Sequence, residues 1–239
     1  MDIETKYAVK LFFPSSTFLQ IYLEAIANAF DAEASEVTIH ISTDGQISPS
    51  HLEITISDNG IGFTDERFDR FRRVKEPCDP YHKGLGRLVY LQYFSSVNVT
   101  SIYEDKKRSF TFSNNFMGDS ETKEASDDDQ RETVLRFNGF LGVRLKSYDD
   151  LKPSVLKERI LEHFLPIFYD MKKAEKKFKI NIELETRALK KQIKLFPDSL
   201  SLTVADVPFF EQKTIQKNSI SAFDEISMSY VLSVCPYIT

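Results

Sequence analysis

Apolar residues recur at helical spacing near the start of the chain and then alternate with polar residues further along. The run that follows Pro14-Ser15-Ser16-Thr17 carries Leu19, Tyr22, Ile26 and Phe30. This period and the start signal predict a helix over about 16–32. The alternating runs 37–41 and 52–56 predict two half-buried strands, joined by a loop that contains Asp44-Gly45.

The rest of the chain predicts more strands than helices. Residues 65–73 and the run opened by Gly84-Leu85-Gly86 predict short helices, and 149–173 predicts a long helix kinked at Pro166. The acidic stretch 118–132 has almost no apolar residues and is expected to be a flexible loop. Strands are expected near 96–103, 109–113, 133–137, 141–145, 178–184, 201–204 and 226–234. One polar face per strand favours an α+β fold in two layers, in which helices cover one face of a mixed, mainly antiparallel sheet.

Composition narrows the class of protein. The apolar runs are too short to span a bilayer, and the first residues lack a secretory signal, so no membrane is expected. The cysteines, Cys78 and Cys235, lack metal-ligand spacing, which favours a reduced, cytoplasmic protein. A net charge of −5 argues against a dedicated nucleic-acid binder. The charge is also divided, because no Lys or Arg occurs between Lys10 and Arg67 and several arginines then follow together.

Three motifs carry candidate chemistry. In the first, Glu24, Asn28 and Asp31 lie four and three residues apart, so they share one face of the predicted helix. A solvated surface is the plain interpretation. The gaps on this face are filled by small residues, which would let a ligand approach closely: Ala25, Ala27, Ala32 and Ala34.

The other two motifs are rich in glycine. Asp58-Asn59-Gly60-Ile61-Gly62 follows a strand, where glycines allow a sharp turn and a close approach to a flat ring. Lys83-Gly84-Leu85-Gly86-Arg87 stands where a helix is expected to begin, and free N–H groups there favour an anion. Each motif alone is weak, because Asp-Asn-Gly turns occur in plain hairpins and Gly-x-Gly patterns occur in many loops.

In this order and spacing, the three motifs together resemble the GHKL ATPase family, which includes gyrase, the heat-shock chaperone, histidine kinases and MutL. The resemblance covers about the first two-thirds of the chain and implies the Bergerat fold. It also implies an ATP-binding domain over residues 1–177, and residues 178–239 would begin a second, transducer-like module that is incomplete. The phosphate turn is most similar to that of bacterial stand-alone members, some of which serve in defence against phage.

The resemblance assigns a role to each motif. Asn28 would hold magnesium, with Asp31 on the same binding face, and Asp58 would bind the adenine amino group with Gly60 and Gly62 forming the turn against the base. Lys83, Gly84, Leu85 and Gly86 would wrap the phosphates, and Arg87 would assist them. Thr133 matches, more loosely, a threonine at the back of the adenine pocket. Residues 64–82 would form the lid.

Glu24 distinguishes branches of the family. ATPase branches carry glutamate at this position as the base that activates water, whereas histidine kinases typically carry asparagine. The sequence therefore favours slow, magnesium-dependent hydrolysis, coupled in a larger protein to lid closure and an ATP-dependent homodimer. Two alternatives remain: a non-catalytic nucleotide-sensing module and, less favoured, a histidine-type protein kinase. The C-terminal partner domain or protein is not named by the sequence, and nucleic-acid contact has no support beyond the basic run near Lys172.

Overall fold

The structure is a computed structural model, and it describes residues 16–44, 51–72, 86–142, 148–186, 199–208, 211–219 and 227–234. Its main sheet consists of β1 (Glu36–Thr43), β2 (Leu52–Asp58), β3 (Phe94–Tyr103), β4 (Lys106–Ser113), β5 (Glu121–Glu124), β6 (Glu132–Phe140), β7 (Lys179–Thr186) and β8 (Ser199–Thr203). The strand order is β5-β4-β3-β6-β2-β1-β7-β8. Only the β1–β7 pair among these neighbours is parallel, which confirms the mixed, mainly antiparallel α+β fold.

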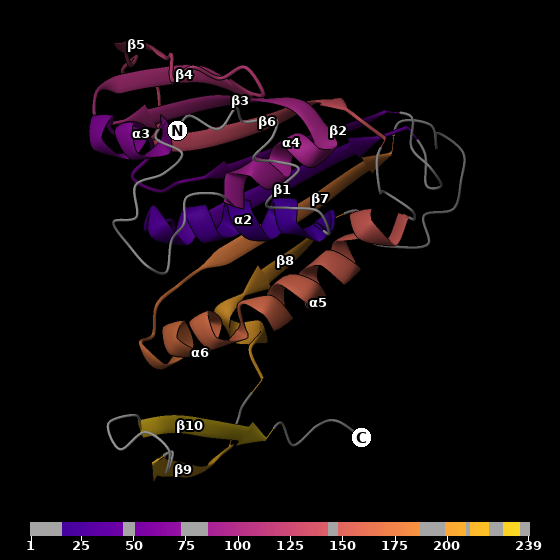
Figure 1. Ribbon diagram of the computed structural model, residues 1–239, viewed down its shortest axis with the longest axis vertical. Coiled ribbons are helices and arrows are strands. Elements are labelled where there is room, and N and C mark those ends of the chain that lie inside the picture. Colours follow the sequence, from indigo (N-terminus) through magenta and orange to yellow (C-terminus); the bar gives the residue numbers. More distant parts are fainter. Residues whose placement is uncertain are drawn as a thin grey trace. The chain divides into compact units, whose positions relative to one another are not determined.

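Helices pack on one face of this sheet (Figure 1). The described α-helices are α2 (Leu19–Asp31), α3 (Asp65–Arg72), α4 (Tyr90–Tyr93), α5 (Pro153–His163) and α6 (Leu165–Lys173). Short 3₁₀ turns are η1 (Gly86–Val89), η2 (Tyr148–Leu151) and η3 (Val204–Asp206). Helix α2 contacts β1, α4 leads directly into β3, and α5 contacts β7 and β8.

The core forms where the predicted apolar positions meet. Val37, Ile39 and Ile41 of β1 are fully buried, and they alternate with half-buried or exposed residues. Tyr22 and Ile26 bury the apolar face of α2 above them. Fully burying one such side chain stabilises a fold by about 1.5–3 kcal/mol, so this row fixes the register of β1 beneath α2. In that register Val37 pairs with Asp58, which places the end of β2 beside the start of β1.

Several boundaries differ from the sequence-based expectations. The stretch 118–132 was expected to be a loop, but it contains β5, which pairs with β4. All four β5 residues are exposed, so this edge strand has no apolar alternation to reveal it. The expected helix after Gly86 is only η1 followed by the four residues of α4, and Phe94 already begins β3. The helix over 149–173 divides at Phe164 into α5 and α6, beside the expected kink at Pro166.

The chain divides into two compact units, Met1–Val204 and Ala205–Thr239. The second contains β9 (Glu211–Ser219) and β10 (Ser227–Val234), which pair antiparallel in a sheet of their own. The expected domain boundary lies after residue 177, yet β7 and β8 pair in the main sheet. The division between units thus falls later in the chain, and the transducer-like character of the second module stays a prediction.

Candidate functional site

Helix α2 presents its polar face to the turn that opens η1. Glu24 is half-buried on this face, whereas Asn28 and Asp31 are exposed. A Cβ atom added to Gly86 would lie 2.0 Å from Oε2 of Glu24, so the Gly86 backbone packs directly on that carboxylate. The first and third motifs, far apart in sequence, therefore meet at Glu24.

Arg87 follows this contact and is buried. Only 8% of the residue is exposed, and its guanidinium lies 4.3 Å from the ring centroid of Phe71 in α3. Burial lowers the pKa of Arg87 to about 10, and the Glu24 carboxylate opposes that shift. Arg87 therefore remains a cation at neutral pH, and its buried Nε has no hydrogen-bond partner within the described part of the chain. A desolvated cation of this kind favours a nearby anion.

Tyr90 completes this side of the site, and the sequence interpretation missed it. The side chain is buried, and burial followed by the nearby Glu24 charge raises the pKa of the phenol well above its usual value. Asn28 opposes the rise, which places its amide beside the Tyr90 hydroxyl, although too loosely for a well-formed hydrogen bond. A neutral phenol thus lies near both Glu24 and Asn28 of α2. Its one signal in the sequence is its place three residues after Arg87.

The second motif forms the other side of the site. Asp58 is the last residue of β2, and its Oδ1 accepts a hydrogen bond from the N–H of Gly60 at 2.9 Å. Burial raises the pKa of Asp58 to about 6, while the Gly60 hydrogen bond and the charge of Arg67 act in the opposite direction. The carboxylate is therefore mostly ionised at neutral pH and can accept a hydrogen bond from a ligand.

This turn is tied to the end of α2. Asn59 Oδ1 accepts hydrogen bonds from the backbone N–H groups of Ser35 and Glu36, at 2.8 and 3.0 Å. A Cβ on Gly60 would lie 2.6 Å from both Cβ and the carbonyl oxygen of Ala32. Small residues on α2 were expected to admit a ligand, but Ala32 instead admits the backbone of this turn. The expectation was wrong for Ala32, because residues distant in sequence fill the space.

Gly62 packs against the Ser101 hydroxyl of β3, which in turn lies beside the Thr133 hydroxyl of β6. It has a φ of +77°, and an added Cβ would lie 2.6 Å from Oγ of Ser101. Ser101 Oγ lies 3.0 Å from Oγ1 of Thr133, and Thr133 pairs with Asp58 across the β2–β6 ladder. The structure therefore places Asp58, Gly62 and Thr133 near one another around Ser101, and their roles toward a nucleotide stay predictions. It adds Ser101, whose signal was a polar residue on the apolar face of β3.

Comparison with known proteins identifies this segment. Residues 15–115 match the family described as histidine kinase-, DNA gyrase B-, and HSP90-like ATPase. The matched segment belongs to that family. It includes all three motifs, whereas Thr133 lies beyond the matched residues. The resemblance drawn from the motifs is confirmed.

Individual proteins are also similar to this chain. A putative type II restriction enzyme, HgiDII of Herpetosiphon aurantiacus, is 47% identical over 101 residues, which cover 38% of this chain and 15% of that protein. The Aquifex aeolicus MutL ATPase domain complexed with ADP is 19% identical, with a TM-score of 0.41, over 71% of this chain and 60% of that one. The N-terminal domain of a DNA repair protein is 16% identical, with a TM-score of 0.43, over 76% and 53%. The chain thus spans only a part of each protein's length, and the two solved structures are too distant to support an argument about the site.

Other expected parts of the ATPase site are only partly described. Lys83, Gly84 and Leu85 lie outside the described residues, as do residues 73–82 of the expected lid. The described part of the lid begins with α3, where Arg67 Nη1 donates to the carbonyl oxygen of Asp31 at 2.9 Å. A cation at the C-terminal end of α2 also complements the helix dipole.

Within the described ranges, no group of three or more His, Cys, Asp or Glu residues that could hold a metal ion occurs. The expected magnesium ligand is a single amide, Asn28, which is not a residue of that kind, and it stays a prediction. No helix among the described residues is long and apolar enough to cross a membrane.

Proposed function

We propose that this chain binds ATP with magnesium and hydrolyses it slowly. Two close contacts of glycine backbones support the proposal most directly: Gly86 packs on the Glu24 carboxylate of α2, and Gly60 packs on Ala32 at the C-terminal cap of α2. These positions are eight residues apart, or about 12 Å along a helix. The expected phosphate turn and the expected adenine turn thus meet the same helix at separate points, leaving the exposed Asn28 between them.

The chemistry of the side chains fits this division between an adenine side and a phosphate side. The ionised, half-buried Asp58 would accept a hydrogen bond from the adenine amino group, and Gly62 would lie against the base. Asn28 would offer its amide oxygen to magnesium, which supplies charge neutralisation for the phosphates when bound. Arg87 is a buried cation beside Glu24 and Gly86 and would favour the phosphate anion.

Glu24 would act as the general base. Its carboxylate lies against Gly86, the last glycine of the phosphate turn, where the terminal phosphate and the attacking water are expected. A base positioned in this way takes a proton from water as the phosphoryl group departs, and its removal typically costs about 10²–10⁴ in rate.

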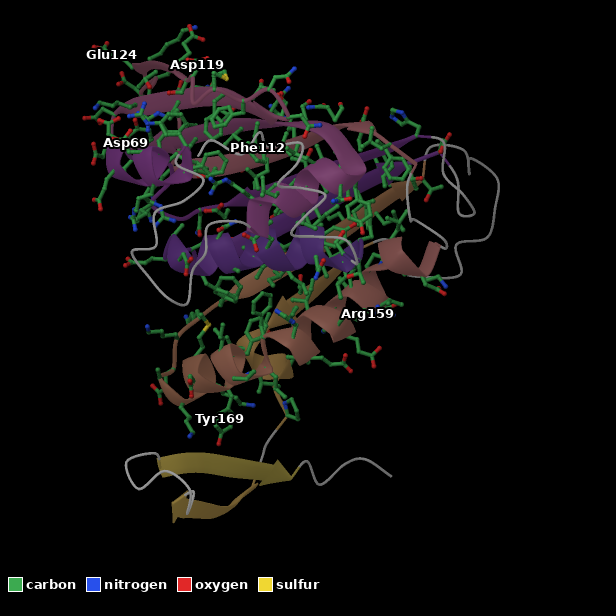
Figure 2. All side chains as sticks on the ribbon, in the orientation of Figure 1. Asp69, Phe112, Asp119, Glu124, Arg159 and Tyr169 are labelled. Atoms are coloured by element: carbon green, nitrogen blue, oxygen red, sulfur yellow. The ribbon has the colours of Figure 1, made fainter. Side chains whose placement is uncertain are left out.

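The test combines calorimetric titration of magnesium-ATP with steady-state phosphate release. We expect Asp58→Asn to lose measurable binding, and Glu24→Ala to bind ATP but lose at least about a hundredfold in turnover. Glu124→Ala serves as a matched control, because Glu124 is exposed on β5 (Figure 2). Binding without release by the wild type would instead indicate the nucleotide-sensing module. Transfer of labelled phosphate to protein would indicate the kinase, and failure of the wild type to bind would overturn the proposal.

The role of the larger protein is proposed more broadly. Nucleotide binding would close the lid and bring two copies together, and sedimentation with and without a non-hydrolysable ATP analogue tests this dimer. Monomers under both conditions would contradict it. The name of the restriction-enzyme relative supports a nucleic-acid or defence context for the complete protein. The net charge of −5 does not favour this chain itself as the DNA contact.

A further inference from the structure

Arg108 of β4 lies beneath the connection between β2 and α3. Its side chain is only 6% exposed. Nη1 donates hydrogen bonds to the carbonyl oxygens of Phe63 and Thr64, at 2.7 and 2.9 Å, and Nη2 binds the Asp65 carboxylate. One guanidinium thus holds three consecutive residues immediately after Gly62.

The same connection is held from β3 as well. The N–H of Phe63 donates to Oγ of Ser101 at 2.8 Å, and Ser101 in turn lies within hydrogen-bond distance of Thr133. The peptide groups on either side of Phe63 are therefore fixed by side chains of two neighbouring strands. Neither set of bonds belongs to a backbone ladder, so these side chains contribute directly to where this segment lies.

The dipole of α3 by itself does not favour a guanidinium at this place. Arg108 lies at the N-terminal end of α3, where the helix dipole disfavours a positive charge. Asp65 offsets that cost, and the cation also lies 4.7 Å from the ring centroid of Phe68. The two carbonyl bonds, however, precede the helix and act on the segment that continues from the adenine turn.

We propose that Arg108 is a positioning residue for base recognition, which fixes Gly62 and Phe63 relative to Asp58 and Thr133. The inference rests on the proposed ATP-binding function, because the base is expected to lie against Gly62. Loss of Arg108 would loosen this wall of the adenine site and leave the phosphate side, at Glu24 and Gly86, unchanged. ATP and ADP should therefore be weakened equally, while the preference for ATP over GTP should fall.

The test measures binding of ATP, ADP and GTP by calorimetry to the wild type and to Arg108→Gln and Arg108→Lys. We expect Arg108→Gln to bind both adenine nucleotides about tenfold more weakly, as for one lost charge-assisted hydrogen bond, with an unchanged ATP-to-ADP ratio. Arg108→Lys, which can keep one carbonyl bond and the charge, should show a smaller loss. Arg159→Gln is the control, because Arg159 is exposed on α5 (Figure 2).

Each outcome is decisive when circular dichroism shows that the variant is folded. An unchanged preference for ATP over GTP in Arg108→Gln would overturn the positioning role while leaving the proposed function intact. If Arg108→Gln does not fold, the same comparison is made with Arg108→Lys. A smaller fall in the preference for ATP over GTP is expected there, and an unaltered preference would overturn the positioning role. A wild type that binds no nucleotide would overturn the proposed function itself.

Discussion

Two features of Asp58 have opposite effects on its pKa: a hydrogen bond from the backbone lowers it and burial raises it. Its carboxylate is held at the end of β2 by the Gly60 N–H, yet burial raises its pKa from 3.8 to about 6. The folded protein therefore binds a proton more readily than the unfolded chain between these values. Stability consequently falls as the pH rises through this window, and the full cost is present above about pH 6.

We therefore predict that Asp58→Asn stabilises the protein at pH 7.5 while it abolishes ATP binding. The shift corresponds to at most about 3 kcal/mol in the free energy of unfolding, and partial solvation makes 1–2 kcal/mol a reasonable expectation. Urea unfolding at pH 7.5 and pH 5 measures it, with Asp128→Asn in an exposed turn as the control. A variant less stable than wild type at pH 7.5 would show that Asp58 serves the fold rather than a ligand.

Arg87 belongs to the third motif, but the residues that surround its side chain lie outside that motif. The sequence interpretation placed it beside the phosphates as an assisting cation. In the structure the guanidinium is buried over Phe71, and Glu24 and Tyr90 are its charged and phenolic neighbours. Its contact with phosphate stays a prediction, but its burial indicates that it also joins the phosphate turn to α3.

At the scale of elements, α2 is the support on which both glycine turns rest. Gly60 meets the Ala32 backbone, whereas Gly86 meets the end of the Glu24 side chain. A backbone cannot move aside as easily as a flexible carboxylate. The same substitution should therefore have different consequences in the two turns.

We predict that Gly60→Ala chiefly lowers stability and that Gly86→Ala chiefly lowers turnover. Overpacking against the Ala32 carbonyl should cost about 1–3 kcal/mol, measured by urea unfolding. Gly86→Ala should keep its unfolding midpoint and displace Glu24, which steady-state phosphate release would report as a large loss. If both variants lost stability equally, the contact at Glu24 would be as rigid as the one at Ala32.

At the scale of the whole chain, the position of β7 decides how much of the sequence the ATPase fold requires. Strand β7 pairs in parallel with β1 along its full length, and β8 covers its other edge. Ile180 and Ile182 are fully buried in this arrangement. Residues beyond the expected boundary at 177 are thus part of the core beneath α2 and α5.

We predict that a chain ending at Val204 folds, whereas one ending at Lys177 does not. Removing β7 exposes the edge of β1 and the apolar residues that face α5, which leaves unpaired strand groups and exposed apolar surface. Circular dichroism and thermal unfolding of the two truncated chains distinguish these cases. A cooperative transition in the shorter chain would restore the boundary at 177.

The first helix, the first two strands and the candidate motifs could be predicted from the sequence alone, although the roles of the motif residues stay predictions. The spacing of apolar residues, together with helix-start and turn residues, predicted α2, β1 and β2. Each of these elements buries one regular row of apolar side chains. The three motifs predicted the ATPase family, because few folds require a carboxylate-amide helix face and two glycine turns in that order. The sequence did not predict β5, because an edge strand that is exposed on both faces has no alternation of apolar residues.

Only the tertiary structure decided which residues meet. The close contact between Glu24 and Gly86 joins residues that are far apart in the sequence, and so does the contact between Gly60 and Ala32. Ser101 and Tyr90 gained their roles in the same way, since neither lies in a motif. Arg108 looks in sequence like an ordinary charge on a strand, and only burial beneath residues 63–65 gives it a place in the site. Such contacts depend on strand register and helix packing, which act over distances along the chain that local patterns do not record.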